Sequence, residues 1–201
     1  KTTLATLIAK TMGSELVTTS GPILERPSDL VGELTRLGRG NVLFIDEVHR
    51  MRTHVEEFLY SAMEDFRLDL SVDDGAFARS VSMKLKRFTL IGATTRAGLL
   101  TKPFRDRFGI QERLTSYSPE NLKDIVLRSA KLLRVKIDDD AATLIAERAR
   151  GTPRVANRFL ARLRDVALAG DHPRVTYAVA EEGLEMLGVD SHGLDAMDRR
   201  L

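Results

Sequence analysis

The sequence predicts an α/β fold, in which helices cover a parallel sheet, followed by a small all-helical domain. The main evidence is a set of short, uninterrupted apolar runs, at residues 42–45 and 88–93, which are typical of strands buried on both faces. Helical patterns lie between these runs, and after Pro119 the pattern is helical throughout. We therefore expect alternating strands and helices over residues 1–117 and helices alone over residues 118–187.

The first part of the chain contains several expected strands and one long helix. The strands are residues 17–19, 42–45 and 88–93, with a further one at residues 109–113. Apolar side chains at helical spacing predict a helix after the second strand. These side chains are Val55, Phe58, Leu59, Ala62, Met63 and Phe66.

A β-hairpin is expected over residues 67–86. Apolar and polar side chains alternate in two runs, and the turn-forming residues Asp73, Asp74 and Gly75 lie between them. A hairpin this small cannot bury its apolar face on itself, and exposed apolar patches usually mark interfaces. We therefore expect the following side chains to bind a partner rather than to join the core: Leu68, Leu70, Val81 and Met83.

Four helices are expected after residue 117. Ser118 is placed to cap the first helix, and three aspartates at residues 138–140 precede the second, at the favourable end of its dipole. Thr152 and Pro153 are typical of the start of a third helix. Residues 177–187 form the fourth, and the polar residues 188–201 are expected to begin a further domain.

The composition indicates a globular protein and excludes several classes. Apolar residues make up 43% of the 201 residues and charged residues 30%, which is enough apolar surface for a packed core. The absence of cysteine excludes a disulfide scaffold and a thiolate metal site, and the four histidines show no metal-ligand spacing. No apolar run is long enough to span a membrane. A net charge of +2 is too small to indicate nucleic-acid binding by itself.

Two carboxylates, Asp46 and Glu47, directly follow the apolar run at residues 42–45. Ligands of open α/β sheets bind at the carboxyl ends of the strands. There, the first carboxylate would hold Mg²⁺ and the second would orient a water for attack on a phosphate. Thr94 and Thr95 end the run at residues 88–93 and would lie beside the carboxylates if the two strands are neighbours. On these residues alone, an acidic helix cap and ordinary turn chemistry explain the two patterns at least equally well.

Several cationic side chains suit phosphate chemistry. The Lys-Thr-Thr at residues 1–3 matches the end of a phosphate-binding loop, although any helix can start this way. Arg105 and Arg107 could stabilise the charge that develops in phosphoryl transfer, or could simply form a basic helix end. Arg154 lies in the first turn of a helix, where the dipole disfavours a cation. An anionic partner would explain Arg154, and a tolerated surface arginine is the alternative.

The order of these motifs resembles that of AAA+ ATPases, which are P-loop NTPases. Longer strings are similar to the RuvB family of Holliday-junction branch-migration motors. They read TSGP at residues 19–22, LFIDEVHR at residues 43–50, AMEDF at residues 62–66, TLIGATTRAGLL at residues 89–100 and RDRFGI at residues 105–110. The resemblance covers essentially the whole chain.

The resemblance implies an ATP-dependent motor that works as a homohexameric ring on branched double-stranded DNA. The cofactors would be ATP and Mg²⁺, the location cytoplasmic and the pathways recombination and DNA repair. RuvA would dock on the hairpin at residues 67–86, and a resolvase of the same pathway would be a further partner. The fold implied is an AAA+ large domain with an inserted hairpin, then a helical lid.

The resemblance also assigns the phosphate and metal contacts by position. Lys1 resembles the phosphate-loop lysine, Thr2 the Mg²⁺ ligand and Thr3 a further nucleotide contact. Asp46 and Glu47 match the Walker B pair, in which the aspartate binds Mg²⁺ and the glutamate orients the attacking water.

Other roles follow from the later motifs. Thr94 or Thr95 matches the sensor 1 residue, and Arg107, with Arg105 as the alternative, matches the arginine finger that acts on a neighbouring subunit. Arg154 matches sensor 2, and Tyr117 the residue beside the nucleotide at the lid junction. A further nucleotide-proximal segment is Glu64, Asp65 and Phe66.

The sequence departs from the family pattern in two respects. Ala76-Phe77 at the hairpin tip and residues 85–88 differ from the usual strings, which affects the expected RuvA docking surface. The phosphate-loop glycines and a winged-helix DNA-binding domain are absent, so we expect a fragment that is inactive alone. The alternative functions are another AAA+ ATPase, such as a clamp-loader subunit, and a non-hydrolysing scaffold. The intact carboxylate pair argues against the scaffold.

Overall fold

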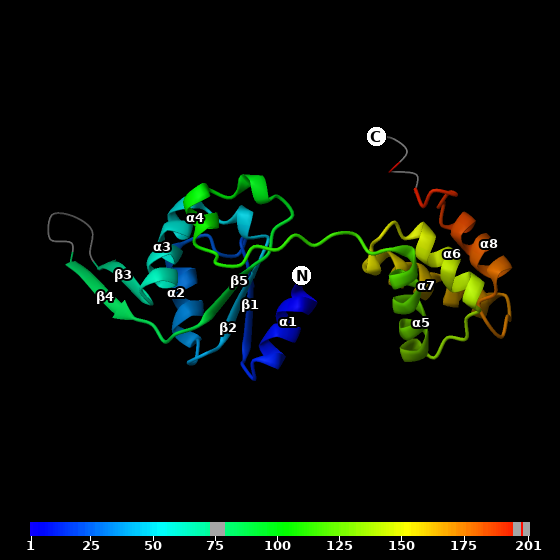
Figure 1. Cartoon of the computed structure of the whole chain (residues 1–201), viewed down its shortest axis with the longest axis horizontal. Helices are drawn as coiled ribbons and strands as arrows, with labels where there is room; N and C mark the ends of the chain where they lie inside the picture. The colour runs from blue at the N-terminus through cyan, green and yellow to red at the C-terminus, as the bar shows by residue number, and fades with distance from the viewer. Residues whose placement is uncertain (73–78, 195–197, 199–201) are drawn as a thin grey trace. The chain divides into compact units, whose positions relative to one another are not determined.

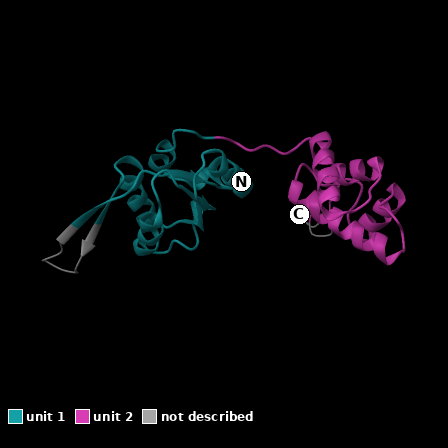
Figure 2. Cartoon of the chain, turned by 90° about the horizontal axis from the view of Figure 1, so that it is seen from below, with its two compact units in different colours: residues 1–111 teal, residues 112–201 magenta. Residues whose placement is uncertain are grey.

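The chain divides into two compact units, residues 1–111 and 112–201 (Figure 2). The structure is a computed structural model that describes residues 1–72, 79–194 and 198. Each unit has its own hydrophobic core. The domain boundary expected from the sequence, between residues 117 and 118, stays a prediction.

A parallel sheet of three strands forms the centre of the first unit (Figure 1). Its order is β1 (Leu16–Ser20), β2 (Val42–Asp46), β5 (Thr89–Gly92). Val42 pairs with Leu16 on one side and with Thr89 on the other. The apolar side chains of β2 are at most 1% exposed, as expected for a strand with neighbours on both edges and helices on both faces. The predicted parallel sheet is confirmed.

Helices cover both faces of this sheet (Figure 1). The side chain of Phe44 packs with Ala5 and Ala93 on the face of α1 (Thr2–Thr11). Leu43 and Ile45 point to the opposite face, where they share a core with residues of α2 (Pro27–Arg36), α3 (Thr53–Glu64) and α4 (Lys102–Asp106). These residues are Leu30, Leu34, Val55, Leu59 and Phe104. Two short 3₁₀ helices, η1 (Val48–Arg50) and η2 (Ala97–Leu99), follow β2 and β5.

The predicted hairpin is present and is formed by β3 (Arg67–Val72) and β4 (Arg79–Lys84). Its expected turn, at residues 73–75, and the Ala76-Phe77 tip lie outside the described residues. Leu68 pairs with Met83, and the chain beyond β4 returns to the core because the Leu85 N–H donates to the Phe66 carbonyl.

The prediction that the apolar face of the hairpin is free for a partner is wrong at its base. Leu68 is fully buried in the core that contains α3, and Met83 is half-buried against the same core. The cause is that β3 follows α3 directly and packs on it. Val81 is 50% exposed and fits the expectation, while the side chain of Leu70 is not among those described.

This difference between Leu68 and Val81 predicts effects of very different size on stability. Leu68→Ala in the full-length protein should lower the free energy of unfolding by ~2–5 kcal/mol, because it removes buried methyl groups and leaves a cavity. Val81→Ser, at an exposed position of the paired strand, should change it by no more than about 0.5 kcal/mol. Denaturant unfolding of both variants measures the difference, and equal losses would show that the hairpin base is not core.

The strand expected at residues 109–113 is wrong. These residues carry no regular structure, and Ile110 is 83% exposed. Among the described residues, β5 pairs only with β2, and residues 109–113 do not join its other edge.

The second unit is a bundle of four helices, as predicted. They are α5 (Pro119–Leu133), α6 (Asp139–Arg148), α7 (Pro153–Ala169) and α8 (Tyr177–Met186). Ser118 caps α5 by accepting a hydrogen bond from the backbone N–H of Asn121. Thr152 occupies the N-cap position of α7 but its hydroxyl makes no capping bond. The core includes Leu122, Ile145, Leu160 and Leu184.

Candidate functional site

The loop after β2 holds the two predicted carboxylates in a tight turn. Glu47 has φ of 48°, in the left-handed region that non-glycine residues rarely adopt. The chain after β1 packs against this turn, and the Gly21 N–H donates a hydrogen bond of 2.8 Å to the Asp46 carbonyl. A Cβ atom on Gly21 would lie 2.5 Å from the Glu47 carbonyl oxygen, so only glycine fits there. The Asp46 carboxylate accepts a hydrogen bond from the Glu47 N–H.

The two predicted threonines lie beside these carboxylates, as the strand order requires. The Ala93 N–H donates to the Ile45 carbonyl at 2.9 Å, which continues the β2–β5 pairing to the end of the strands. Two residues further along, the Thr95 hydroxyl donates to Glu47 Oε2 at 3.0 Å. Thr94 contacts a different partner, since its Oγ1 lies 2.9 Å from Nδ1 of His49. The two threonines therefore have different surroundings.

His49 is a site residue that the sequence analysis missed. Its side chain is 6% exposed and its Nδ1 lies 3.5 Å from Glu47 Oε2. Thr94 Oγ1 accepts a hydrogen bond from the Arg96 N–H, so its own proton can be donated to Nδ1. The spacing of the four histidines bears only on metal binding and does not indicate this role. The signal in the sequence that does indicate it is the position of His49, two residues after Glu47 in the tight turn.

The start of α1 lies at the same edge of the sheet. Lys1 Nζ donates a hydrogen bond of 2.6 Å to the Thr94 carbonyl, and Ala5, one turn further on, packs against Phe44. The first turn of α1 carries no acidic residue and exposes Thr2 and Thr3. A helix N-terminus of this kind, with a lysine beside it, favours anions.

A second group of predicted residues meets at the ends of α3 and α4. Arg107 ends α4, and its Nε lies 3.0 Å from Glu64 Oε1. Asp65 is the exposed C-cap of α3. Phe66 packs edge-to-face on Phe88, which makes it part of the packing around the hairpin base. Among the described residues, no hydrogen bond or ion pair joins Arg107 or Glu64 to the groups around Glu47.

The remaining predicted residues belong to the second unit. The Tyr117 N–H donates to the Gly151 carbonyl at 3.0 Å, and the Tyr117 side chain is 49% exposed. Gly151 has φ of 75°, and a Cβ there would lie 2.5 Å from the Cβ of Ser116. Arg154 is exposed in the first turn of α7. Tyr117 and Arg154 are thus brought to the same end of this unit by the Gly151 turn.

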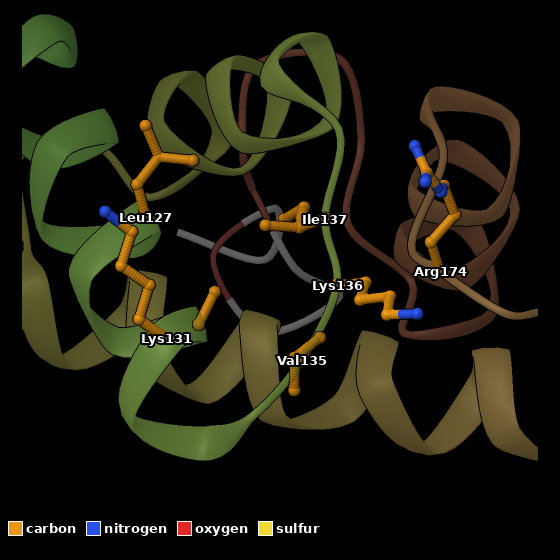
Figure 3. A pocket seen from close by; sticks show the side chains of 7 residues that line it. Leu127, Lys131, Val135, Lys136, Ile137 and Arg174 are labelled. Atoms are coloured by element: carbon orange, nitrogen blue, oxygen red, sulfur yellow. The ribbon is translucent and has the colours of Figure 1, made fainter.

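A pocket of about 500 Å³ adjoins the Glu47 turn. The residues that line it are Glu47, His49, Arg50, Thr95, Arg96 and Leu99. Another pocket, of about 320 Å³, lies in the second unit beside α5 (Figure 3). None of the seven residues that line this second pocket is a predicted site residue.

The donors at the sheet edge suit a nucleotide with Mg²⁺. No group of three or more histidine, aspartate or glutamate side chains that could hold a metal occurs in the described part of the chain. Mg²⁺ needs no such group, because it is usually bound by one or two protein oxygens together with waters and substrate phosphates. The Asp46 carboxylate and the Thr2 hydroxyl supply oxygens of this kind, and Lys1 supplies a cation for the phosphates.

Comparison with known families gives the same assignment over most of the chain. Residues 1–114 match the family described as the Holliday junction DNA helicase RuvB P-loop domain, and residues 117–190 match the RuvB AAA lid domain. The chain belongs to the RuvB family. Its RuvB-type fold, a parallel-sheet domain with an inserted hairpin followed by a helical lid, therefore agrees with the prediction, and the clamp-loader alternative is set aside.

RuvB relatives match the chain from end to end. It is 54% identical over 201 residues to the Holliday junction branch migration complex subunit RuvB of Methanoregula boonei, and 52% identical to that of Chlorobaculum parvum. The solved structure of the Thermotoga maritima RuvB Holliday junction branch migration motor is 44% identical, with a TM-score of 0.88 over 99% of this chain. A point mutant of the same protein gives 0.91. The chain spans about three fifths of these relatives, covering 60%, 59% and 62% of their lengths.

Proposed function

We propose that this chain carries the ATP-hydrolysing and lid parts of a motor that drives Holliday-junction branch migration in recombination and repair. The observation that carries the proposal is the group at the carboxyl edge of the sheet. There, Thr95 holds the Glu47 carboxylate and Lys1 reaches the Thr94 carbonyl. A carboxylate, a hydroxyl and a cation at one helix N-terminus suit phosphoryl transfer from ATP to water. The RuvB relatives, which are named for this process, support the same conclusion.

In the proposed reaction, Lys1 and the N–H groups at the start of α1 bind the phosphates, with Thr3 as a further contact. Thr2 and Asp46 would hold Mg²⁺, which would polarise the phosphate oxygens when bound. Glu47 orients the water that attacks the γ-phosphorus. The bond to the bridging oxygen then breaks, and ADP and phosphate are released.

Other residues of the chain complete the proposed site. Thr95 fixes the Glu47 carboxylate, while Thr94 links Lys1 to His49. Since Thr95 contacts Glu47 directly, it is our choice for sensor 1. Tyr117 and Arg154 contact the nucleotide from the lid. Arg107 acts on the nucleotide of the next subunit, with Glu64, Asp65 and Phe66 as the nearby segment.

The proposed assembly is a homohexamer that acts with RuvA on branched double-stranded DNA in the cytoplasm, with a resolvase as a possible further partner. Among the described residues, no helix is both long enough and apolar enough to cross a bilayer. Among the described side chains of the hairpin, Val81 is apolar and exposed, which supports RuvA docking there. The proposed domains are an ATPase domain at residues 1–117, a lid at residues 118–187 and the start of a DNA-binding domain at residues 188–201.

An ATPase assay on the full-length protein, with and without a four-way DNA junction and RuvA, tests this function. We expect ATP hydrolysis that the junction and RuvA stimulate, and a loss of about a hundredfold or more in Lys1→Ala, because the phosphates lose their main cation. Lys10→Ala, at the other exposed end of α1, is the matched control and should behave like the parent. A protein that binds junctions but never hydrolyses ATP would instead be a scaffold.

A further inference from the structure

A carboxylate is buried between α3 and α4, and it lies on the helix that separates two of the motifs discussed above. Glu56 is 6% exposed, and it is the one charged residue among the described residues that is buried. A buried carboxylate is costly unless hydrogen bonds satisfy it. Glu56 Oε1 accepts a bond of 2.6 Å from the Tyr60 hydroxyl and a second bond from the Thr101 hydroxyl. Neither partner is a cation, so charge neutralisation does not explain why the carboxylate is there.

Tyr60 connects this carboxylate to Arg107. Burial, and then the hydrogen bond to Glu56, raise the pKa of Tyr60, so the phenol keeps its proton at neutral pH and donates it to the carboxylate. The face of the same ring supports the guanidinium of Arg107, whose Cζ lies 4.0 Å from the ring centroid. At this distance the ring attracts the cation and fixes the plane of the guanidinium.

Thr101 connects the carboxylate to the backbone that carries Arg107. It is the N-cap of α4, and its Oγ1 accepts a hydrogen bond from the Phe104 N–H while its proton goes to Glu56. α4 has only five residues and Arg107 is its C-cap, whose own N–H donates to the Phe104 carbonyl. Glu56 therefore fixes both the ring below the guanidinium and the start of the helix that presents it.

The guanidinium itself is only partly satisfied. Arg107 Nη1 donates to the Pro103 carbonyl at 2.8 Å. Nε is buried and has no hydrogen-bond partner in the described structure, although it lies 3.0 Å from Glu64 Oε1. The Glu64 side chain is 55% exposed, and Nη2 has no partner among the described residues. The guanidinium is held in place on one face by the ring, and Nη2 is the donor that remains for an anion.

We propose that Glu56, Tyr60 and Thr101 form a positioning set that orients Arg107 toward the phosphates of a nucleotide bound to a neighbouring subunit. The inference rests on the proposed function, in which Arg107 acts in trans. A free arginine loses several rotamers when it binds an anion, so a side chain that is already oriented binds its target at lower entropic cost. None of the three positioning residues needs to touch the nucleotide.

The test uses kinetics of ATP hydrolysis by the full-length protein. Tyr60→Leu, which removes the supporting ring, should lower kcat about tenfold while the KM for ATP changes by less than about twofold, because the subunit's own binding site is intact. Tyr60→Phe keeps the ring but loses the hydrogen bond to Glu56, so it should lower kcat less than Tyr60→Leu does. Glu56→Gln should lower kcat severalfold, and Glu57→Gln, at the exposed neighbouring position, is its matched control.

Mixed rings separate positioning from a general structural role. A Lys1→Ala subunit has a defective nucleotide site but an intact Arg107 and Tyr60. Mixed with Tyr60→Leu subunits, the Lys1→Ala subunit should restore part of the ATPase activity. Its intact Arg107 then faces the intact nucleotide site of a Tyr60→Leu subunit. A defect confined to the fold of the variant subunit would not be restored in this way. Thermal unfolding of each variant shows whether it is folded. If Tyr60→Leu is not folded, the kcat values of the nearly isosteric variants Glu56→Gln and Tyr60→Phe test the positioning set instead.

The outcomes distinguish this inference from the proposed function. If Arg107→Ala hydrolyses ATP normally, the proposed role of Arg107 fails and the set has nothing to position. If Arg107→Ala is inactive while folded Tyr60→Leu and Glu56→Gln keep the parent kcat, the positioning set alone is overturned. Loss of activity that mixing never restores also overturns it. A fall in kcat at constant KM that mixing restores supports it.

Discussion

Glu47→Gln is expected to bind ATP with nearly unchanged affinity and to hydrolyse it at least about a hundredfold more slowly. The amide keeps the size of the carboxylate and can still accept the hydrogen bond from Thr95, but it cannot hold an attacking water as a base does. Glutamine also tolerates the left-handed backbone at this position as well as glutamate does, so the turn after β2 should survive. Single-turnover hydrolysis and equilibrium nucleotide binding measure the two effects separately.

Glu25→Gln, at an exposed position of the first unit, is the control for the loss of one carboxylate, and it should behave like the parent. Hydrolysis near the parent rate in Glu47→Gln would reject Glu47 as the water-orienting residue. Loss of ATP binding would point to a role in holding the nucleotide instead.

Arg107→Ala should reduce ATP turnover of the assembled ring by about 10³-fold or more, the effect typical of losing an arginine that stabilises phosphoryl transfer from outside the site. Arg105→Ala is the matched control, since it changes an arginine of the same short helix whose side chain has no hydrogen bond or ion pair in the part of the chain described here. A much larger effect at Arg107 than at Arg105 is the result that the proposed roles require.

Mixing Arg107→Ala subunits with Lys1→Ala subunits tests whether Arg107 acts between subunits. Each variant alone should be inactive, but at some interfaces of a mixed ring an intact Arg107 faces an intact nucleotide site. Partial recovery of turnover is therefore expected. Mixtures that form rings and remain as inactive as either variant would show that Arg107 acts within its own subunit or only in packing.

The parts of the fold set by local patterns could be predicted from the sequence. Uninterrupted apolar runs marked β2 and β5. The apolar side chains of β2 are buried because helices cover both of its faces, whereas β5 is only partly buried. Alternation marked the hairpin, and cap residues such as Ser118 marked helix starts. The proximity of Thr95 to Glu47 was expected only if the two strands are neighbours, and the sequence left that condition open.

The features that depend on packing between distant segments could not be predicted. Alternation shows which side of the hairpin is apolar, but not that α3 covers Leu68. Periodicity carries no information about His49, whose role comes from a turn between strand and helix. The partners of Glu56 lie on α3 and at the start of α4, and nothing in the spacing of Glu56 and Thr101 indicates that they meet.

The connectivity of the sheet affects the order in which the parts of the chain fold. β2 and β5 are adjacent in space, yet α3 and the whole hairpin lie between them in sequence. Contacts between distant segments form slowly, because the chain loses conformational entropy in closing the loop before the contacts can stabilise it. The helices of the second unit contact their sequence neighbours and can form early. The edge that carries the proposed catalytic residues exists only once β5 lies against β2, so we expect it to be among the last features of the molecule to form.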